Sequence, residues 1–286
     1  MTDFDSLWDY NNPAETEKKF REFLPKAEKS HDTSYYAQLL TQIARTQGLQ
    51  MKFDEAHKTL DVAEKLIDDN MILVKVRYLL ERGRTYNSSK VYDKARELFL
   101  EAYTLAESLR LDFYAVDAAH MMGIVEKGDE SLKWNEIAMT YAETCDEKRA
   151  KNWLGSLYNN TGWTYSDMGE FEKALELFKK NVIWHEERNS GIELIIAKWC
   201  VARTLRSLGK VEEAYQAQIE LNKETEDKKL EQDGYNYEEI GECLLLLNRG
   251  DESKPYFKKA YEMLSKDIWL QANEAERLER LKKLGE

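Results

Sequence analysis

A fixed spacing of small and large residues recurs along the chain and limits the folds that it can adopt. Residues 155–181, GSLYNNTGWTYSDMGEFEKALELFKKN, carry this spacing as Gly162, Ala174 and Phe178. The spacing recurs at Ala44, Ala56 and Leu60; Gly83, Ala95 and Phe99; Ala119, Ser131 and Asn135; Ala202, Ala214 and Gln218; and Gly241, Ser253 and Phe257. Small residues so separated let two helices joined by a short turn cross closely, and the large residue fills the adjacent groove. The pattern therefore predicts a series of helix pairs.

This pattern resembles the tetratricopeptide repeat family, whose unit is a helix–turn–helix of about 34 residues. The fragments GWTYSDMGEFEKALELFKKN and GRTYNSSKVYDKARELFLEA carry the resemblance most clearly. It implies an all-α, right-handed superhelical solenoid of antiparallel helix pairs. An ordinary helical bundle is the alternative, but a bundle would lack the fixed register. The chain is also similar to bacterial proteins that consist only of such repeats.

The repeat period is longer than the family's usual one. The second small residue recurs at positions 56, 95, 131, 174, 214 and 253, in steps of 36 to 43 residues. We therefore expect either helices extended by a turn or longer loops between repeats.

The domain organisation follows from the same register. We predict one solenoid over residues 1–286 with about seven helix pairs. Residues 1–31 would form a partial first repeat, in which Asn12 caps a helix that starts at Pro13. Residues 266–286 would form a capping helix that opens near Asp267 and closes at Gly285, with charged faces that suit the last layer of a stack.

Composition and charge restrict the partners. The chain has 3 Pro, 13 Gly and 34% charged residues, which favours helices. Its net charge of −12 disfavours nucleic acid and anionic membranes as partners. The N-terminus lacks the features of a signal peptide, and no apolar run is long enough for a membrane span, so we expect a cytoplasmic protein. Its three cysteines are expected to be reduced thiols.

Motifs for catalysis are missing from the sequence. It contains no glycine-rich phosphate loop, HExxH, GxSxG or CxxC, and its four histidines fall in different repeats. We therefore predict no enzyme activity, no metal site and no cofactor. A remote alternative is a hydrolase of small molecules or nucleotides that uses arginines and His120, with Glu238 or Glu242 as general base.

The candidate ligand-binding residues lie on the first helix of each pair, which usually lines the concave groove of such a solenoid. Beside the packing stripe, the register places one continuous set: Arg45, Arg84, His120, Asn159, Asn160, Trp163, Trp199, Arg203 and Arg206. Arginine is suited to bidentate capture of carboxylates, asparagine to a peptide backbone, and tryptophan to apolar contacts. Alternatively, Arg84 could pair with Glu81 or Asp117, and the tryptophans could be buried between repeats.

These residues favour a module that binds a protein or peptide in its groove. Arg203 and Arg206 would hold a carboxylate, as in the carboxylate-clamp uses of the family, while Asn159 and Asn160 fix the backbone. A structural scaffold that docks folded partners through its outer or terminal surfaces is the alternative.

Overall fold

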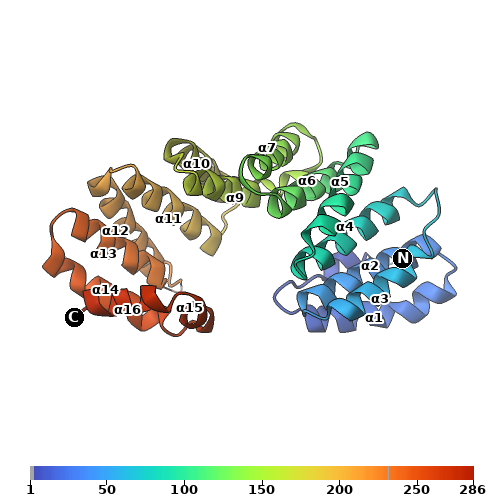
Figure 1. Ribbon diagram of the computed structural model, residues 1–286, viewed down its shortest axis with the longest axis horizontal. Helices are drawn as coiled ribbons and strands as arrows, with labels where there is room; N and C mark the ends of the chain where they lie inside the picture. The colour runs from blue at the N-terminus through green and yellow to red at the C-terminus, as the bar shows by residue number, and fades with distance from the viewer. Residues whose placement is uncertain (1–2, 231) are drawn as a thin grey trace. The chain divides into compact units, whose positions relative to one another are not determined.

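The computed structural model describes residues 3–230 and 232–286, and this part of the chain contains helices and turns but no strand (Figure 1). The predicted all-α fold of antiparallel helix pairs is confirmed. Residues 1 and 2, which the prediction included in the partial first repeat, lie outside the described residues. Contacts between residues divide the chain into two compact units, residues 1–157 and 158–286. Each unit is described by itself, and the single domain over 1–286 stays a prediction.

Unit 1 contains the partial first repeat and three complete helix pairs. Its elements are η1 (Phe4–Leu7), α1 (Pro13–Lys29), α2 (Thr33–Leu49), α3 (Phe53–Glu64), α4 (Ile72–Ser88), α5 (Tyr92–Ser108), α6 (Asp112–Val125), α7 (Gly128–Thr144) and α8 (Lys148–Lys151). The pairs are α2–α3, α4–α5 and α6–α7. The first two pairs contact each other through α2 and α3 against α4, and the next two through α5 and α4 against α6. We call the first helix of each pair the A helix and the second the B helix.

Unit 2 contains three further pairs and the C-terminal end. Its elements are α9 (Leu154–Asp167), which starts just before the unit boundary, α10 (Phe171–Glu186), α11 (Ile192–Ser207), α12 (Val211–Asp227), α13 (Gly234–Leu246), α14 (Gly250–Leu264), α15 (Ile268–Asn273) and α16 (Ala275–Leu284). The pairs are α9–α10, α11–α12 and α13–α14. α16 packs on α14 and closes the core there.

The long period has two structural causes. Helices α2, α4, α5, α7 and α12 each have 17 residues, which makes a pair longer than the usual repeat. The longest step, from Ser131 to Ala174, also contains the extra short helix α8, which packs against α6 and α7.

The packing stripe behaves as the spacing predicts. Phe99, Phe178 and Phe257 of the B helices are fully buried. A Cβ added to Gly162 would lie 2.6 Å from a ring carbon of Phe178, and one added to Gly241 would lie 2.8 Å from Phe257. At these crossings the A helix must therefore lack a side chain, whereas alanine fits at Ala44, Ala119 and Ala202, where the B helix has no phenylalanine at the matching position.

Except between α6 and α7, where Glu126 and Lys127 are extended, the turns between A and B helices use one backbone conformation. Met51, Lys90, Gly169, Gly209 and Asn248 have positive φ angles. The following residue donates its N–H to a carbonyl five residues back, as from Glu170 N to Tyr165 O (2.9 Å). This is a Schellman ending, in which glycine avoids the steric cost of the left-handed region.

The sequence predicted the start of α1 correctly, but it did not predict that the C-terminal segment is divided into two helices. Asn12 accepts a hydrogen bond from Glu15 N and Pro13 starts α1, as predicted. The capping segment, predicted as one helix, forms α15 and α16. Glu274, with φ −131° and ψ 37°, interrupts it. The interruption lets Leu270 and Leu281, on different helices, join the same core cluster.

The close crossing can be tested with two identical substitutions. Gly162→Ala should lower the free energy of unfolding by about 1–3 kcal/mol, because the new methyl group displaces the Phe178 ring. Gly48→Ala on α2 meets only Thr85 Oγ1, at 3.9 Å. It should be neutral or stabilising by up to about 1 kcal/mol, since alanine is the better helix former. Urea unfolding of both variants measures the difference; equal effects would contradict the packing role.

Candidate ligand-binding face on the A helices

The A-helix face of unit 1 carries a network of ion pairs across three helices. Arg45 on α2 donates to Glu81 on α4 over 3.1 Å. Arg84 on α4 donates to Glu81 over 2.8 Å and also to Asp117 on α6 by a short bond. Glu81 and Asp117 are both buried. The predicted residues Arg45 and Arg84 therefore share one buried carboxylate, and their first role is to join neighbouring repeats.

His120 lies at the inner end of this network. It is 6% exposed, and its ring centroid is 5.1 Å from that of Trp153. Its Nδ1 has no hydrogen-bond partner among the described residues. Burial lowers the pKa of His120, while the nearby Asp117 opposes that shift. The histidine is therefore a neutral packing residue at neutral pH.

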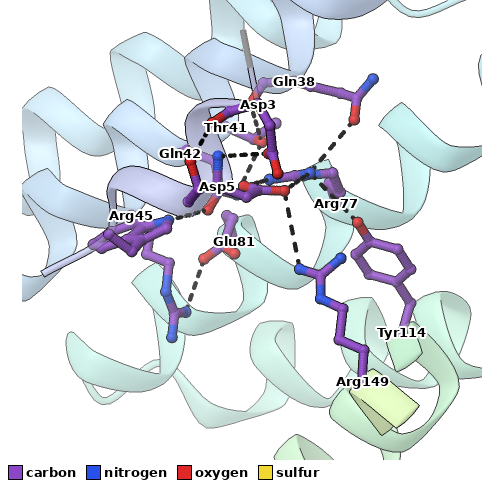
Figure 2. Close-up of polar contacts among 12 residues, drawn as sticks. Asp3, Asp5, Gln38, Thr41, Gln42, Arg45, Arg77, Glu81, Tyr114 and Arg149 are labelled. Atoms are coloured by element: carbon purple, nitrogen blue, oxygen red, sulfur yellow. Dashed lines mark hydrogen bonds and ion pairs between the residues drawn. The ribbon is translucent and has the colours of Figure 1, made fainter. Parts of the chain in front are cut away.

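A second acidic group enters this face from the N-terminal end of the chain. Asp5 of η1 accepts two hydrogen bonds from Arg77 on α4, of 2.8 and 2.6 Å, as Figure 2 shows. A cavity of about 410 Å³ lies beside this pair. Its lining includes Trp8, Tyr10, Phe113, Tyr114, Trp153 and the arginines 45, 84 and 149.

The A-helix face of unit 2 carries a row of aromatic rings. Trp163 of α9 lies 6.1 Å from Trp199 of α11, and Trp199 lies 6.3 Å from Tyr235 of α13, measured between ring centroids. The guanidinium of Arg203 lies over Trp163 and Trp199, at 4.9 and 5.7 Å. We call Trp163, Trp199 and Tyr235 the aromatic row. All three rings are half-buried, so each offers part of its surface.

The two predicted clamp arginines hold an internal carboxylate. Arg206 donates to both oxygens of Glu239, over 2.7 and 2.8 Å, and Arg203 donates to the same group over 3.2 Å. Glu239 is 5% exposed. The sequence placed Glu238 and Glu242 on this face but missed Glu239. In the structure Glu238 and Glu242 pair with arginines 277 and 280 of α16.

The two predicted asparagines are adjacent and half-buried. Asn159 Nδ2 donates to Asn160 Oδ1 over 3.4 Å, and the thiol of Cys200 contacts Asn159 Oδ1 at 3.8 Å. Burial raises the pKa of the Cys200 thiol to about 12, so it remains a neutral donor. The predicted set in unit 2 thus forms a connected surface from Asn159 to Arg206.

A cavity of about 290 Å³ opens beside the aromatic row, where α11, α12 and α13 meet. Its lining is mostly apolar and includes Ile195, Leu221, Asn222, Thr225, Trp199, Tyr235 and Asn236. Ile192 and Ile196 also line it, and they are 43% and 46% exposed. Two buried polar atoms at this site, Trp199 Nε1 and Asn236 Oδ1, have no hydrogen-bond partner among the described residues. The two isoleucines are absent from the predicted set, because apolar side chains on a helix carry no signal that separates a binding residue from a packing residue.

The described residues contain no group of three or more His, Cys, Asp or Glu side chains that could hold a metal ion. None of their helices is long and apolar enough to cross a membrane.

The helix pairs of the described residues form a helical-repeat fold that resembles the tetratricopeptide type, and comparisons with known proteins agree. Residues 154–187 match the family model described as tetratricopeptide repeat. The predicted resemblance to this family is confirmed, by sequence over that repeat and by fold over most of the chain. No curated protein matches the sequence.

Solved structures share the fold at low identity. The apo form of RapI is similar with a TM-score of 0.74 and 14% identity, over 93% of this chain and 76% of that one. A signal transduction ATPase with a tetratricopeptide repeat sensor from Pyrococcus horikoshii gives 0.75 and 14%, over 95% of this chain but 42% of that one. NprR in complex with its cognate peptide NprX gives 0.54 and 13%, over 94% and 78%. At such identities these likenesses concern the fold.

The role of Glu239 can be tested by removing its charge. Glu239→Gln should lower the free energy of unfolding by about 1–3 kcal/mol, because it leaves Arg203 and Arg206 without a counter-charge in a partly screened site. Glu252→Gln removes an exposed partner of Arg249 and should have little effect. Chemical denaturation compares the two, and an equal response would contradict a structural role for the buried pair.

The burial of His120 predicts a pH dependence. Its folded-state pKa lies below the ordinary 6.5, so the unfolded chain takes up the proton first as the pH falls. The contribution of neutral His120 to the free energy of unfolding is therefore present above pH 6.5, and it decreases as the pH falls below 6.5. The His120→Gln variant should lose less stability than the wild type between pH 7.5 and 5.5, as measured by urea unfolding. Parallel pH profiles would show that His120 is not the cause.

Proposed function

We propose that this protein binds an extended peptide on its A-helix face, and that unit 2 contacts the apolar side chains of that peptide. The observation that carries the proposal is the aromatic row beside a mostly apolar cavity, with exposed Ile192 and Ile196 at its edge. Rigid aromatic surface with few polar groups is typical of peptide and ligand sites. We keep the predicted cytoplasmic location as part of the proposal.

Two unpaired polar atoms support a peptide as the ligand. Buried polar groups nearly always have a partner, so an indole N–H and an amide oxygen without one suggest groups reserved for a bound molecule. Trp199 Nε1 can donate to a peptide carbonyl, and Asn236 Oδ1 can accept from a peptide N–H. A peptide backbone supplies both complements along one strand. The relative NprR is a peptide-bound protein of similar fold.

In this proposal, the predicted carboxylate clamp is not the main determinant of peptide binding. Arg203 and Arg206 are suited to hold a carboxylate, and the carboxylate that they hold here is that of Glu239. A peptide carboxylate would have to replace or share this buried partner. We therefore assign the main contribution at this face to apolar contacts and treat recognition of a terminal carboxylate as secondary.

The scaffold alternative has one observation in its favour. The B-helix side of unit 2 has a cleft of about 450 Å³ lined by residues of α10, α11 and α12, among them Val182, Ile183 and Val201. Ile183 is 56% exposed. A folded partner docked there would depend on Ile183 and not on the aromatic row.

The hydrolase alternative is not favoured by the site. Its suggested bases, Glu238 and Glu242, are held by Arg277 and Arg280. His120 lies in unit 1, where it is buried against Trp153.

A peptide library displayed against the purified full chain tests the proposal. Peptides selected on the wild type should bind Trp199→Ala at least tenfold more weakly, because the variant removes the centre of the aromatic row. Trp184→Ala, the same substitution on the B helix α10, should bind as the wild type does. Fluorescence anisotropy measures both, and equal loss in the two variants would contradict the proposed surface.

The clamp is tested with the same peptides carrying free or amidated C-termini. Because Glu239 already occupies both arginines, we expect a preference for the free carboxylate of less than about tenfold. Loss of binding on amidation would instead make the terminal carboxylate the primary determinant. A partner whose binding is abolished by Ile183→Ala but not by Trp199→Ala would favour the scaffold alternative.

A further inference from the structure

Residues 3–12, which we call the N-terminal segment, lie on the A-helix face of unit 1. Phe4 is 5% exposed and contacts the rings of Phe20 and Tyr35 edge-on, with centroid distances of 6.0 and 5.2 Å. Trp8 packs edge-on against Phe20 at 5.3 Å, and its indole N–H donates to Gln42 Oε1 over 3.0 Å. The segment thus inserts two aromatic anchors into unit 1.

Between these anchors, Asp5 neutralises a buried cation. The side chain of Arg77 is 7% exposed and donates to both oxygens of Asp5. Its Nη1 also lies 3.4 Å from Gln38 Oε1 and Tyr114 OH. Arg149 approaches Asp5 from the other side at 3.9 Å, as Figure 2 shows. Arg77, Gln38, Tyr114 and Arg149 thus surround a binding site for a carboxylate. Asp5, which is 72 residues from Arg77 in the sequence, occupies it.

The N-terminal segment leaves space in that site. The cavity of about 410 Å³ reaches past Asp5 and Trp8 to Phe113 and Trp153. Arg77 Nε is buried and has no hydrogen-bond partner among the described residues. Buried polar groups normally use their hydrogen-bond donors. Arg77 has one unused donor and lines an open cavity, so Asp5 satisfies this guanidinium only in part.

The N-terminal segment is also held mainly by side chains. Within the segment, Trp8 N donates to Asp5 O and Asn12 N donates to Asp9 O. The main-chain bonds that leave it go to Thr16 of α1, whose Oγ1 accepts from Asp9 N and donates to Asp9 O and whose N–H donates to Asn12 O. Because a few side chains hold this short element, the free energy needed to detach it is lower than the free energy needed to open the helices beneath it.

We propose that the N-terminal segment is a built-in ligand of unit 1, and that a peptide with the same pattern displaces it. The pattern is an aromatic residue, an acidic residue, two further residues and a second aromatic residue, as in Phe4-Asp5-Ser6-Leu7-Trp8. The site lies in unit 1, apart from the apolar surface proposed for unit 2. Because a tethered competitor acts at an effective concentration in the millimolar range, the segment sets a threshold for the incoming peptide.

The test uses the full chain and a fluorescein-labelled peptide of sequence DFDSLWDYNN, which copies residues 3–12. Asp5→Asn in the chain weakens the built-in ligand and should raise the affinity for the labelled peptide at least tenfold over the wild type. Asp9→Asn makes the same charge change in the same segment, at a side chain that, among the described residues, accepts a local bond from Asn11 N. This control should bind as the wild type does.

A second peptide, with asparagine in place of the residue corresponding to Asp5, should bind the Asp5→Asn chain at least tenfold more weakly than the first. Equal affinity of all three chains for the labelled peptide, or equal affinity of the Asp5→Asn chain for both peptides, would overturn the proposal. Circular dichroism establishes that each variant is folded before titration.

Hydrogen exchange of the wild-type chain gives an independent test that needs no variant. Amides of the N-terminal segment should exchange faster than those of α2, and millimolar unlabelled peptide should accelerate them further. The proposal is overturned if the segment exchanges as slowly as α2 and does not respond to the peptide.

Discussion

The rest of the structure depends on one contact, the close crossing of the two helices of a pair. At this crossing, a backbone position without a side chain lies against a buried ring. At Gly162 and Gly241 the A helix approaches the Phe178 and Phe257 rings so closely that no Cβ fits. Because this stripe alone fixes each pair, the neighbouring stripe of the A helix is free to vary. It is on this second stripe that arginines, asparagines and tryptophans gather.

Ion pairs on that second stripe connect one repeat to the next. Arg45 and Glu81 are 36 residues apart, as are Arg203 and Glu239. The repeat step at both places is 39 residues, so each pair joins an arginine to a glutamate that lies about one helical turn before the equivalent position of the next A helix. The net charge of −12 gives no indication of this arrangement, because the acidic partners of the groove arginines are buried beside them. With the arginines engaged in holding the stack, the aromatic row is the part of the face that is most open to a ligand.

The sequence predicted the helix pairs and the register well, because both depend on local spacing. It also placed Trp163, Trp199 and Arg203 on one face, where they contact one another in the structure. The partner of Arg203 was missed because the register placed Glu238 on the face, whereas Glu239 points about 100° away from Glu238 and was not considered. Asp5, which is 72 residues from Arg77, carries no local signal at all.

Protection from hydrogen exchange on ligand binding tests the central claim, that the A-helix face is the binding surface. With a library-selected peptide bound to the full chain, we predict slower exchange in residues 192–199 of α11 and 234–240 of α13, which flank the aromatic row. The B helix α10, which does not line the cavity, should be unaffected except through general stabilisation. Protection confined to α10 would contradict the account, because it would place the ligand away from the aromatic row.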